Sequence, residues 1–428
     1  MFNERWKATP QVVASVVFFV VSPAILQAQQ ASSAVDPQAF QALMQRVQEL
    51  ENRVHQLEAE KAAAASSSSA AAPSTPAAEQ QAPSASAKMD MPDASEMSGH
   101  SMHEFGDRMR IQGFSDIDYR ASDLKASTNS FVLGQFNLFI SSKLSENTSV
   151  IAETVVEADQ GTNEFGIELE RLLLQYSAND HLNLAFGRYH THIGYYNTEY
   201  HHSAWMQTAM GRPFLYQFED NGGILPIHNV GISATGLVNS RLGLQYIAEI
   251  GNGRSARTSI SNPVQNVTDE NNGKSFNLGL VMRPEAWSGW ELGASGYHDN
   301  LTPLNAVKVG ENIFAGHIVY ANSQFEFLNE AVMLSHSPQG APVAVHTPGF
   351  YSQVSKRFGN YRPYFRYEYV NVPQSDPLYS DVGRQEGPSV GLRYNINEAT
   401  ALKFEYGRSF RRNLDSVNNL GMQLAFAF

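Results

Sequence analysis

Side chains that can carry charge or bind metal gather between residues 190 and 227. The set combines imidazoles, carboxylates and one guanidinium: His190, His192, Glu199, His201, His202, Arg212, Glu219 and Asp220. Carboxylates that face basic groups across a gap create a transverse electric field, which orients dipolar solutes and filters them by charge. A connection as long as 191–227 is expected to have its own structure or a function.

The histidines of this segment allow a second kind of chemistry. His190 and His192 are separated by one residue on an extended stretch, and His201 and His202 follow further along. Neutral imidazoles in this arrangement could bind zinc or copper transiently. The alternative is that they are ordinary polar residues that pack the segment against a neighbouring wall.

Basic partners for such a field occur on later stretches of the chain. In 361–372, charged residues alternate with Phe and Tyr at the period of two that a β-strand gives its faces, and 388–396 and 400–411 repeat this pattern. The charged face must contact water, so the aromatic face contacts lipid, with Tyr at the membrane interface. The predicted water-facing pore wall consists of Arg362, Arg366, Glu368, Arg393, Lys403 and Glu405.

The stretch 418–428 shows the same alternation most clearly. Its large apolar residues share one face, and Gly, Ala and polar residues share the other, until the sequence closes on Phe428. A soluble sandwich could also end on an edge strand, but there a long apolar face would be a liability. A transmembrane β-barrel needs the pattern, because one face meets lipid and the other meets the lumen.

Sixteen alternating stretches fill the chain from about Met109 to Phe428. Short turns and longer loops alternate between them, as in an up-and-down barrel with both ends in the periplasm. The stretch from Phe165 changes its alternation near Glu170-Arg171, so either a β-bulge lies there or the register slips. The predicted fold is therefore all-β and transmembrane, a 16-stranded antiparallel up-and-down β-barrel over residues 107–428.

The region before the barrel is predicted to have three parts. Residues 1–28 have the pattern of a secretory signal peptide, with Arg5 and Lys7 before a short apolar run and cleavage after Ala28. Residues 36–61 carry apolar residues at alternating spacings of three and four, which predicts a periplasmic α-helical coiled coil, preferably of three chains. Its core positions are Phe40, Leu43, Val47, Leu50, Val54 and Leu57.

Residues 62–106 form the third part, a predicted disordered linker rich in Ala, Ser and Pro. The linker ends in a Met/His-rich segment with Met97, His100, Met102 and His103. Thioether and imidazole groups suit soft copper or silver ions. The alternative is a disordered polar segment with scattered methionines.

The region from Met109 to Phe428 resembles the trimeric 16-stranded bacterial outer-membrane porins. The resemblance is carried by Gly187-Arg188, at a strand end before the long loop, and by the terminal Phe428. The preceding coiled coil is similar to that of the phosphate-selective O/P-like and dicarboxylate-channel porins. The resemblance implies passive diffusion of small hydrophilic solutes through a water-filled barrel, a homotrimer in outer-membrane lipid, and recognition by the barrel assembly machinery.

The same resemblance makes 191–227 the third loop, which narrows the pore and sets its selectivity. Phosphate selectivity calls for clustered Lys and Arg. Here the loop places Arg212 against Glu199, Glu219 and Asp220. This departure predicts a weak cation preference, or little preference, instead of phosphate binding.

Composition and missing motifs exclude several other functions. The net charge of −12 argues against nucleic acid as a partner, and the lack of cysteine excludes disulfides and thiolate chemistry. Common hydrolase, metalloprotease and phosphate-loop motifs do not occur in the sequence, so we predict neither an enzyme nor a cofactor. Two alternatives to a porin stay open: a structural tether to peptidoglycan, and a copper- or zinc-handling channel.

Overall fold

The computed structural model describes most of the chain from Met109 onward. The described residues are 109–125, 127–159, 163–200, 203–219, 222–255, 266–303, 307–412 and 414–428. The predicted signal peptide, the coiled coil from Phe40 to Leu57, the linker and the Met/His-rich segment lie outside the described residues. Among the described residues, no helix is long and apolar enough to cross a membrane.

Sixteen strands dominate the described region, with three short helical turns. The turns are α2 (Tyr196–Glu199), η1 (Phe214–Tyr216) and η2 (Glu285–Trp287). The strands are β1 (Met109–Ser122), β2 (Ser130–Lys143), β3 (Thr148–Asp159), β4 (Glu164–Asn179), β5 (Leu182–His190), β6 (His228–Asn239), β7 (Leu244–Gly251), β8 (Ser275–Met282), β9 (Trp290–Leu301), β10 (Val309–Ala321), β11 (Phe325–Pro338), β12 (Val345–Lys356), β13 (Tyr361–Asn371), β14 (Arg384–Asn395), β15 (Thr400–Arg411) and β16 (Val417–Ala427).

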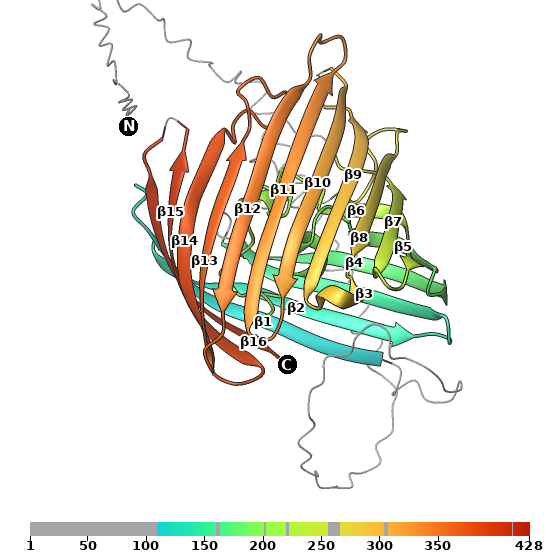
Figure 1. Cartoon of the computed structure of the whole chain (residues 1–428). Helices are drawn as coiled ribbons and strands as arrows, with labels where there is room; N and C mark the ends of the chain where they lie inside the picture. The colour runs from blue at the N-terminus through green and yellow to red at the C-terminus, as the bar shows by residue number, and fades with distance from the viewer. Residues whose placement is uncertain are drawn as a thin grey trace, which may run out of the picture. The chain divides into compact units, whose positions relative to one another are not determined.

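The strands form one closed antiparallel barrel, in which each strand pairs with its sequence neighbours and β16 pairs with β1 (Figure 1). The closing pair runs from Phe114 opposite Ala427 to Ser122 opposite Asn419. Closure leaves no open sheet edge among these strands, which is what a sheet surrounded by lipid requires. The predicted all-β, 16-stranded antiparallel barrel is confirmed.

The connections alternate along the chain as predicted. At the end of the barrel where β1 starts and β16 finishes, the turns are 144–147, 180–181, 240–243, 283–289, 322–324, 357–360 and 396–399. The other end carries 123–129, 160–163, 191–227, 252–274, 302–308, 339–344, 372–383 and 412–416. The turns have two to four residues except 283–289, which contains η2, and all the loops except 160–163 are longer than four residues. We call 191–227 loop L3 and 372–383 loop L7.

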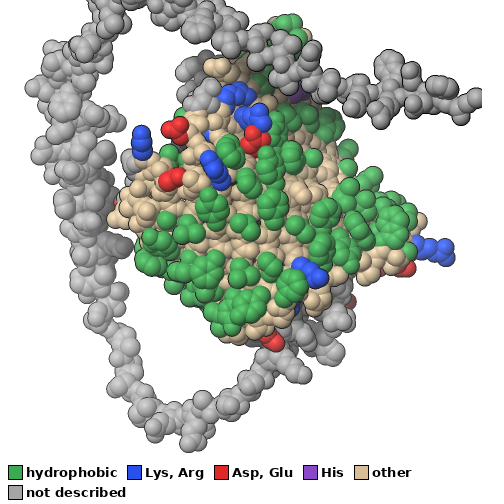
Figure 2. Space-filling view, turned by 60° about the vertical axis from the view of Figure 1, so that its left-hand side comes forward, with side chains coloured by type: hydrophobic (Ala, Val, Ile, Leu, Met, Phe, Trp, Pro, Cys, Tyr) green, Lys and Arg blue, Asp and Glu red, His purple; other side chains and the backbone are tan. Residues whose placement is uncertain are grey.

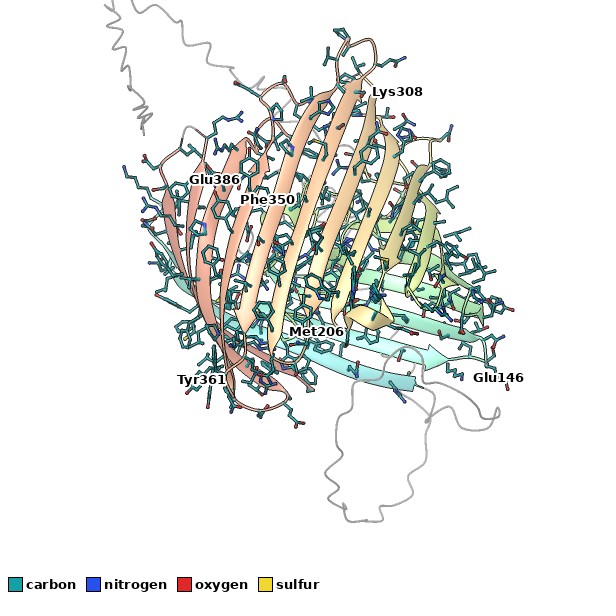
Figure 3. All side chains as sticks on the ribbon, in the orientation of Figure 1. Glu146, Met206, Lys308, Phe350, Tyr361 and Glu386 are labelled. Carbon is teal, nitrogen blue, oxygen red and sulfur yellow. The ribbon has the colours of Figure 1, made fainter. Side chains whose placement is uncertain are left out.

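The outer and inner faces of the barrel differ in chemistry. Phe365 and Phe404 are 45% and 44% exposed, whereas their neighbours Arg366 and Lys403 are 3% and 0% exposed and point inward. Figure 2 shows apolar side chains over much of the outer surface and charged ones toward its edges. Phe350, 40% exposed on β12, belongs to the outward set that stands off the ribbon in Figure 3. An apolar exterior over a polar inner wall suits lipid outside and water inside.

Strand β4 contains a β-bulge, one of the two explanations that its change of alternation left open. Glu153 of β3 pairs with Arg171 and Thr154 pairs with Leu169, so Glu170 is the extra residue. Glu170 and Arg171 are consequently both buried, while the apolar residues on either side of the bulge stay on the outer face. The change of alternation is therefore a bulge and not a register slip.

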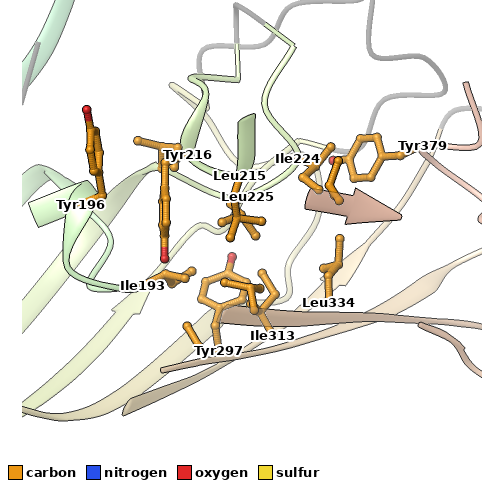
Figure 4. Packing of buried hydrophobic residues seen from close by; sticks show 14 of the residues in the cluster. Ile193, Tyr196, Leu215, Tyr216, Ile224, Leu225, Tyr297, Ile313, Leu334 and Tyr379 are labelled. Atoms are coloured by element: carbon orange, nitrogen blue, oxygen red, sulfur yellow. The ribbon is translucent and has the colours of Figure 1, made fainter. Parts of the chain in front are cut away.

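An apolar core lies inside the barrel on one side of it (Figure 4). It joins loop L3 to the inner faces of β9 to β13 and to loop L7, and each large buried side chain contributes about 1.5–3 kcal/mol. Residues of the core that Figure 4 labels are Ile193, Tyr196, Leu215, Tyr216, Ile224 and Leu225 of L3, with Tyr297, Ile313, Leu334 and Tyr379 facing them.

Candidate functional site

Loop L3 leaves the barrel wall after β5 and returns to it at β6. The N–H of Thr191 donates to the carbonyl of Ile227 at 2.8 Å, which closes the neck of the loop. The side-chain amide of Asn197 donates to both of these residues' carbonyls, at 2.7 and 3.3 Å. Gly194 has a φ of +76°, and a Cβ there would overlap the Tyr216 hydroxyl, so this turn requires glycine.

The buried carboxylate of Glu330 on β11 holds the first part of L3. It accepts hydrogen bonds from the backbone N–H groups of Tyr195 and Tyr196 at 2.6 and 2.8 Å. The hydroxyls of Tyr216 and Tyr351 donate to the same carboxylate at 2.8 and 2.5 Å. One inward carboxylate therefore fixes the start of α2, the η1 turn and the wall together.

Basic residues of the predicted pore wall hold the middle of L3. Lys403 Nζ donates to the carbonyls of Ala204 and Ala209 at 2.5 and 3.2 Å. Arg393 Nη1 donates to two further loop carbonyls at 2.7 and 2.9 Å, and Arg366 donates to two more at 3.1 and 3.3 Å. The sequence suggested that these cations would face loop carboxylates, but they lie under the loop and bind its backbone oxygens.

Carboxylates of the same wall bind donors of the loop. Glu368 accepts a hydrogen bond from the N–H of Phe214 at 2.7 Å, and it also pairs with Arg366 at 2.7 Å. Glu326 accepts hydrogen bonds from the hydroxyls of Thr208 and Tyr200 at 3.1 and 3.2 Å. The wall therefore carries both basic and acidic side chains. Its basic groups donate to carbonyls of the loop, and its acidic groups accept hydrogen bonds from N–H and hydroxyl groups of the loop.

Arg212, the predicted basic residue of the constriction, ties L3 to itself. Its guanidinium donates to the carbonyls of Tyr216 and Tyr200 at 2.5 and 2.7 Å and to Asn197 Oδ1 at 3.2 Å. It also lies 4.1 Å from the ring centroid of Phe218. Burial lowers the pKa of Arg212 from its ordinary value. The cation stabilises the loop's own fold.

Two other predicted constriction residues keep some access to solvent. His192 contacts Glu249 of β7 through Nδ1 at 2.6 Å, and its side chain is 34% exposed. Glu199 in α2 is exposed, and partial desolvation of its carboxyl group, with a smaller contribution from Glu291, raises the pKa of that group. His201, His202 and Asp220 lie outside the described residues.

Four buried titratable side chains meet at the neck of L3. His190 ends β5 and pairs with His228, the first residue of β6, and their ring centroids are 4.8 Å apart. His228 Nε2 lies 2.7 Å from Glu170 Oε2, and its Nδ1 lies 3.1 Å from Glu219 Oε2. Burial alone would raise the pKa of Glu219, but the contacts with His228 hold that pKa below its usual value. Sequence analysis named His190 and Glu219 but did not predict this cluster.

The inner face of β1 to β3 carries polar groups that stay partly open to solvent. The side chain of Arg120 is 58% exposed although it pairs with Asp118 at 2.6 Å. Gln135 donates to Glu157 at 2.9 Å, and both residues are half-buried. Loop L3 packs mainly on β9 to β15, although Trp205 of the loop also stacks on Phe114 of β1 with ring centroids 6.3 Å apart, so the interior of the barrel is filled unevenly.

The other predicted wall residues also point inward. Arg362 lies 3.8 Å from Glu326 and donates to the carbonyl of Ser323 at 3.0 Å. Glu405 accepts a hydrogen bond from the hydroxyl of Tyr364 at 2.8 Å. Each belongs to the inward set of its strand, beside outward aromatic residues, which follows from the alternation that the sequence already shows.

Glu330, Glu326, Glu249 and His228 are the important residues that sequence reasoning missed. Each lies on a strand and contacts groups of L3, which for the three glutamates are more than 50 residues away in the sequence. A usable signal existed in β11, where Glu326 and Glu330 alternate with asparagine and large apolar residues. Inward carboxylates on a strand with such apolar neighbours indicate a covered wall.

A closed 16-stranded antiparallel barrel, apolar outside and polar inside, with a long loop packed within it, is the architecture of the outer-membrane porins. The chain has this porin fold. No protein-family model matches the chain, and a search of curated proteins finds no match.

Solved structures of outer-membrane channels are similar to this chain. The anion-selective porin from Comamonas acidovorans aligns with a TM-score of 0.55 and 11% identity, over 75% of this chain and 99% of the porin. The outer membrane channel DcaP of Acinetobacter baumannii gives 0.54 and 12%, over 75% and 97%. The trimer form of OmpT, an outer membrane protein of Vibrio cholerae, gives 0.52 and 10%, over 75% and 99%. At these identities the likeness shows the fold alone.

Proposed function

We propose that the protein is an outer-membrane porin through which small hydrophilic solutes diffuse passively. The observation that carries the proposal is the uneven filling of the barrel. Loop L3 is packed mainly on β9 to β15 and reaches β1 through Trp205, whereas Arg120, Gln135 and Glu157 of β1 to β3 remain partly or largely exposed on the inner face. The water-filled path runs between the loop and this opposite wall, and the loop narrows it.

The path has little charge preference or a weak cation preference. Arg366, Arg393 and Lys403 would favour anions if they faced the path, but L3 covers them and its carbonyls are their partners. Acidic and basic groups on the open side occur together, as Arg120 with Asp118 does. We therefore do not expect this chain to share the anion selectivity of the porin from Comamonas acidovorans.

The working assembly is a homotrimer surrounded by outer-membrane lipid, with its N-terminal region in the periplasm. The outer band of exposed apolar and aromatic side chains supports the lipid contact. The similar OmpT structure is described as a trimer form, which supports the trimer. Delivery by the barrel assembly machinery, contact of the coiled coil with peptidoglycan and the lack of enzymatic activity stay predictions.

Reconstitution in planar bilayers and liposomes tests this function. The full-length protein should give stepwise conductance, and liposome swelling with sugars of increasing size should show a sharp size limit. Under a salt gradient, the reversal potential should be near zero or should indicate a slight preference for cations. Membrane-inserted protein that conducts no ions and passes no solute would contradict the proposal and leave the structural tether as the better function.

A further inference from the structure

We propose that Glu170, His190 and His228 bind one divalent metal ion of the zinc class inside the barrel. Their ligand atoms all lie within 4.8 Å of one another, and all three residues are buried. The ligands come from three neighbouring strands, β4, β5 and β6. The proposal does not depend on whether the barrel conducts solutes.

The spacing of the ligand atoms suits an ion of this size. Tetrahedral zinc holds nitrogen and oxygen ligands at about 2.0–2.2 Å, which separates the ligand atoms by roughly 3.3 Å. His228 Nε2 and Glu170 Oε2 are 2.7 Å apart, slightly closer than that. The three ligand atoms lie within 4.8 Å of one another, so binding requires side-chain shifts that open the close pair and draw the wider separations in. Two imidazoles and one carboxylate form a ligand set that zinc commonly takes, with a fourth position for water.

The groups behind the two histidines present the correct ring nitrogens. His190 Nδ1 lies 3.1 Å from the carbonyl oxygen of Asn197, which can only accept a hydrogen bond. The proton is therefore on Nδ1, and Nε2 is the unprotonated nitrogen. His228 Nδ1 lies 3.1 Å from Glu219, so its Nε2 is the nitrogen that points to Glu170. A carbonyl or carboxylate behind each ligating histidine is the usual support of a zinc site.

The bulge in β4 gives the third ligand its direction. Regular alternation would send either Glu170 or Arg171 outward, but the extra residue lets both side chains stay inside. Arg171 then pairs with Glu153 at 2.6 Å, which leaves Glu170 directed toward the histidines. Arg188 donates to the backbone carbonyl of Glu170 at 3.0 Å and fixes the strand there.

Charge around the cluster is compatible with a dication. Glu170 and Glu219 supply two negative charges, and both interact electrostatically with the guanidinium of Arg212 in L3. Without metal, the same groups form a proton-shared chain from Glu170 through His228 to Glu219. The ion takes the place of the proton on His228 Nε2, so metal and proton compete for the same atom.

A bound ion would fasten both ends of L3 to the wall. His190 and His228 flank the loop, and Asn197 and Glu219 belong to it. The metal is therefore a structural element of the loop neck, distinct from ions in transit through the path. Deeply buried ligands favour slow exchange and a fixed stoichiometry.

Zinc stoichiometry of the full-length protein tests the proposal. The protein is stripped with a chelator, loaded with zinc alone, separated from free metal and analysed for zinc per chain. A His100→Ala, His103→Ala background removes histidines of the Met/His-rich segment. In this background His228→Gln and Glu170→Gln should each lose one zinc per chain, and Glu219→Gln should weaken binding about 10–100-fold. His346→Gln, a histidine on β12 that contacts Ser335, should keep the full content.

Cobalt substitution keeps the test valid if a variant does not fold. Cobalt bound to the unchanged cluster should give the strong visible bands of a tetrahedral site, and zinc should remove them. Equal zinc content in His228→Gln and His346→Gln would overturn the proposal. So would absence of both zinc and the cobalt bands in the background protein, or a protein whose zinc is held only by the Met/His-rich segment.

Discussion

Replacing Glu330 by Ala should release the first part of L3 from the barrel wall. Four donors converge on this one carboxylate: the amides of Tyr195 and Tyr196 and the hydroxyls of Tyr216 and Tyr351. The substitution removes the acceptor and leaves these donors in a buried, largely apolar place. The four hydrogen bonds are lost with the carboxylate itself, without movement of neighbouring side chains.

The size of the effect follows from the two backbone amides alone. A buried donor left without an acceptor costs about 1–3 kcal/mol, so the amides of Tyr195 and Tyr196 together cost roughly 2–6 kcal/mol. Since about 1.4 kcal/mol corresponds to a tenfold change in an equilibrium, local opening of this part of L3 should rise at least about 30-fold. The hydroxyls of Tyr216 and Tyr351 are buried as well and add to this cost.

Hydrogen exchange of peptides that cover α2 measures this opening in the folded, membrane-inserted protein. Glu330→Ala should speed exchange of the Tyr195 and Tyr196 amides by at least about 30-fold. Glu405→Ala is the matched control, because that inward carboxylate accepts a bond from Tyr364 and holds no amide of L3. A change below about 3-fold for Glu330→Ala, or an equal change in both variants, would refute the role given to this carboxylate.

Three further predictions concern the loops and the two faces of the barrel. Lys403→Met removes the donor to two loop carbonyls and should lower single-channel conductance, because L3 is then held less tightly to β15 and moves into the path; unchanged current would place that part of L3 outside the path. Burial would raise the pKa of Asp376 in L7, but its contact with His336 at 2.8 Å lowers it, so L7 should stay docked at pH 5 and detach below about pH 4. Hydrogen exchange should follow this loss, and detachment near pH 6 would contradict it. Phe404→Arg on the outer face should destabilise refolding into vesicles by about 2–4 kcal/mol, whereas inward Glu405→Gln should cost about 1 kcal/mol; equal denaturation midpoints would contradict the assigned faces.

The fold could be predicted from the sequence because lipid and water impose a strict period of two on each strand. The pattern in β13 to β16 predicted the faces. The change of alternation in β4 indicated a bulge or a register slip, and the structure has the bulge at Glu170. The same pattern predicted that Arg366 and Lys403 point inward. What they contact could not be read from it, because the partners are backbone carbonyls of a loop and those carry no sequence signal.

The interior core escaped prediction for a related reason. Porin strands are expected to be polar on the inside, yet Leu328, Val332 and Val370 are buried under L3. On the inner faces of their strands these residues stand among charged ones, with Glu330 between Leu328 and Val332 and Glu368 before Val370. The alternation alone therefore gave no sign that a loop covers them. Strands with apolar residues of both parities in an otherwise alternating barrel indicate where a loop is packed inside.

The central claim is that one side of each strand meets hydrocarbon while the other side meets a water-filled path. The chain has no cysteine, so single cysteines can be placed without background. Gln135 is half-buried and faces inward on β2, and its neighbour Phe136 is 39% exposed on the outer face. In vesicles and planar bilayers, a membrane-impermeant thiol reagent should modify Gln135→Cys and reduce its conductance, while Phe136→Cys stays protected. Modification of Phe136→Cys with Gln135→Cys unreactive, or equal reaction of both without change in current, would contradict the account.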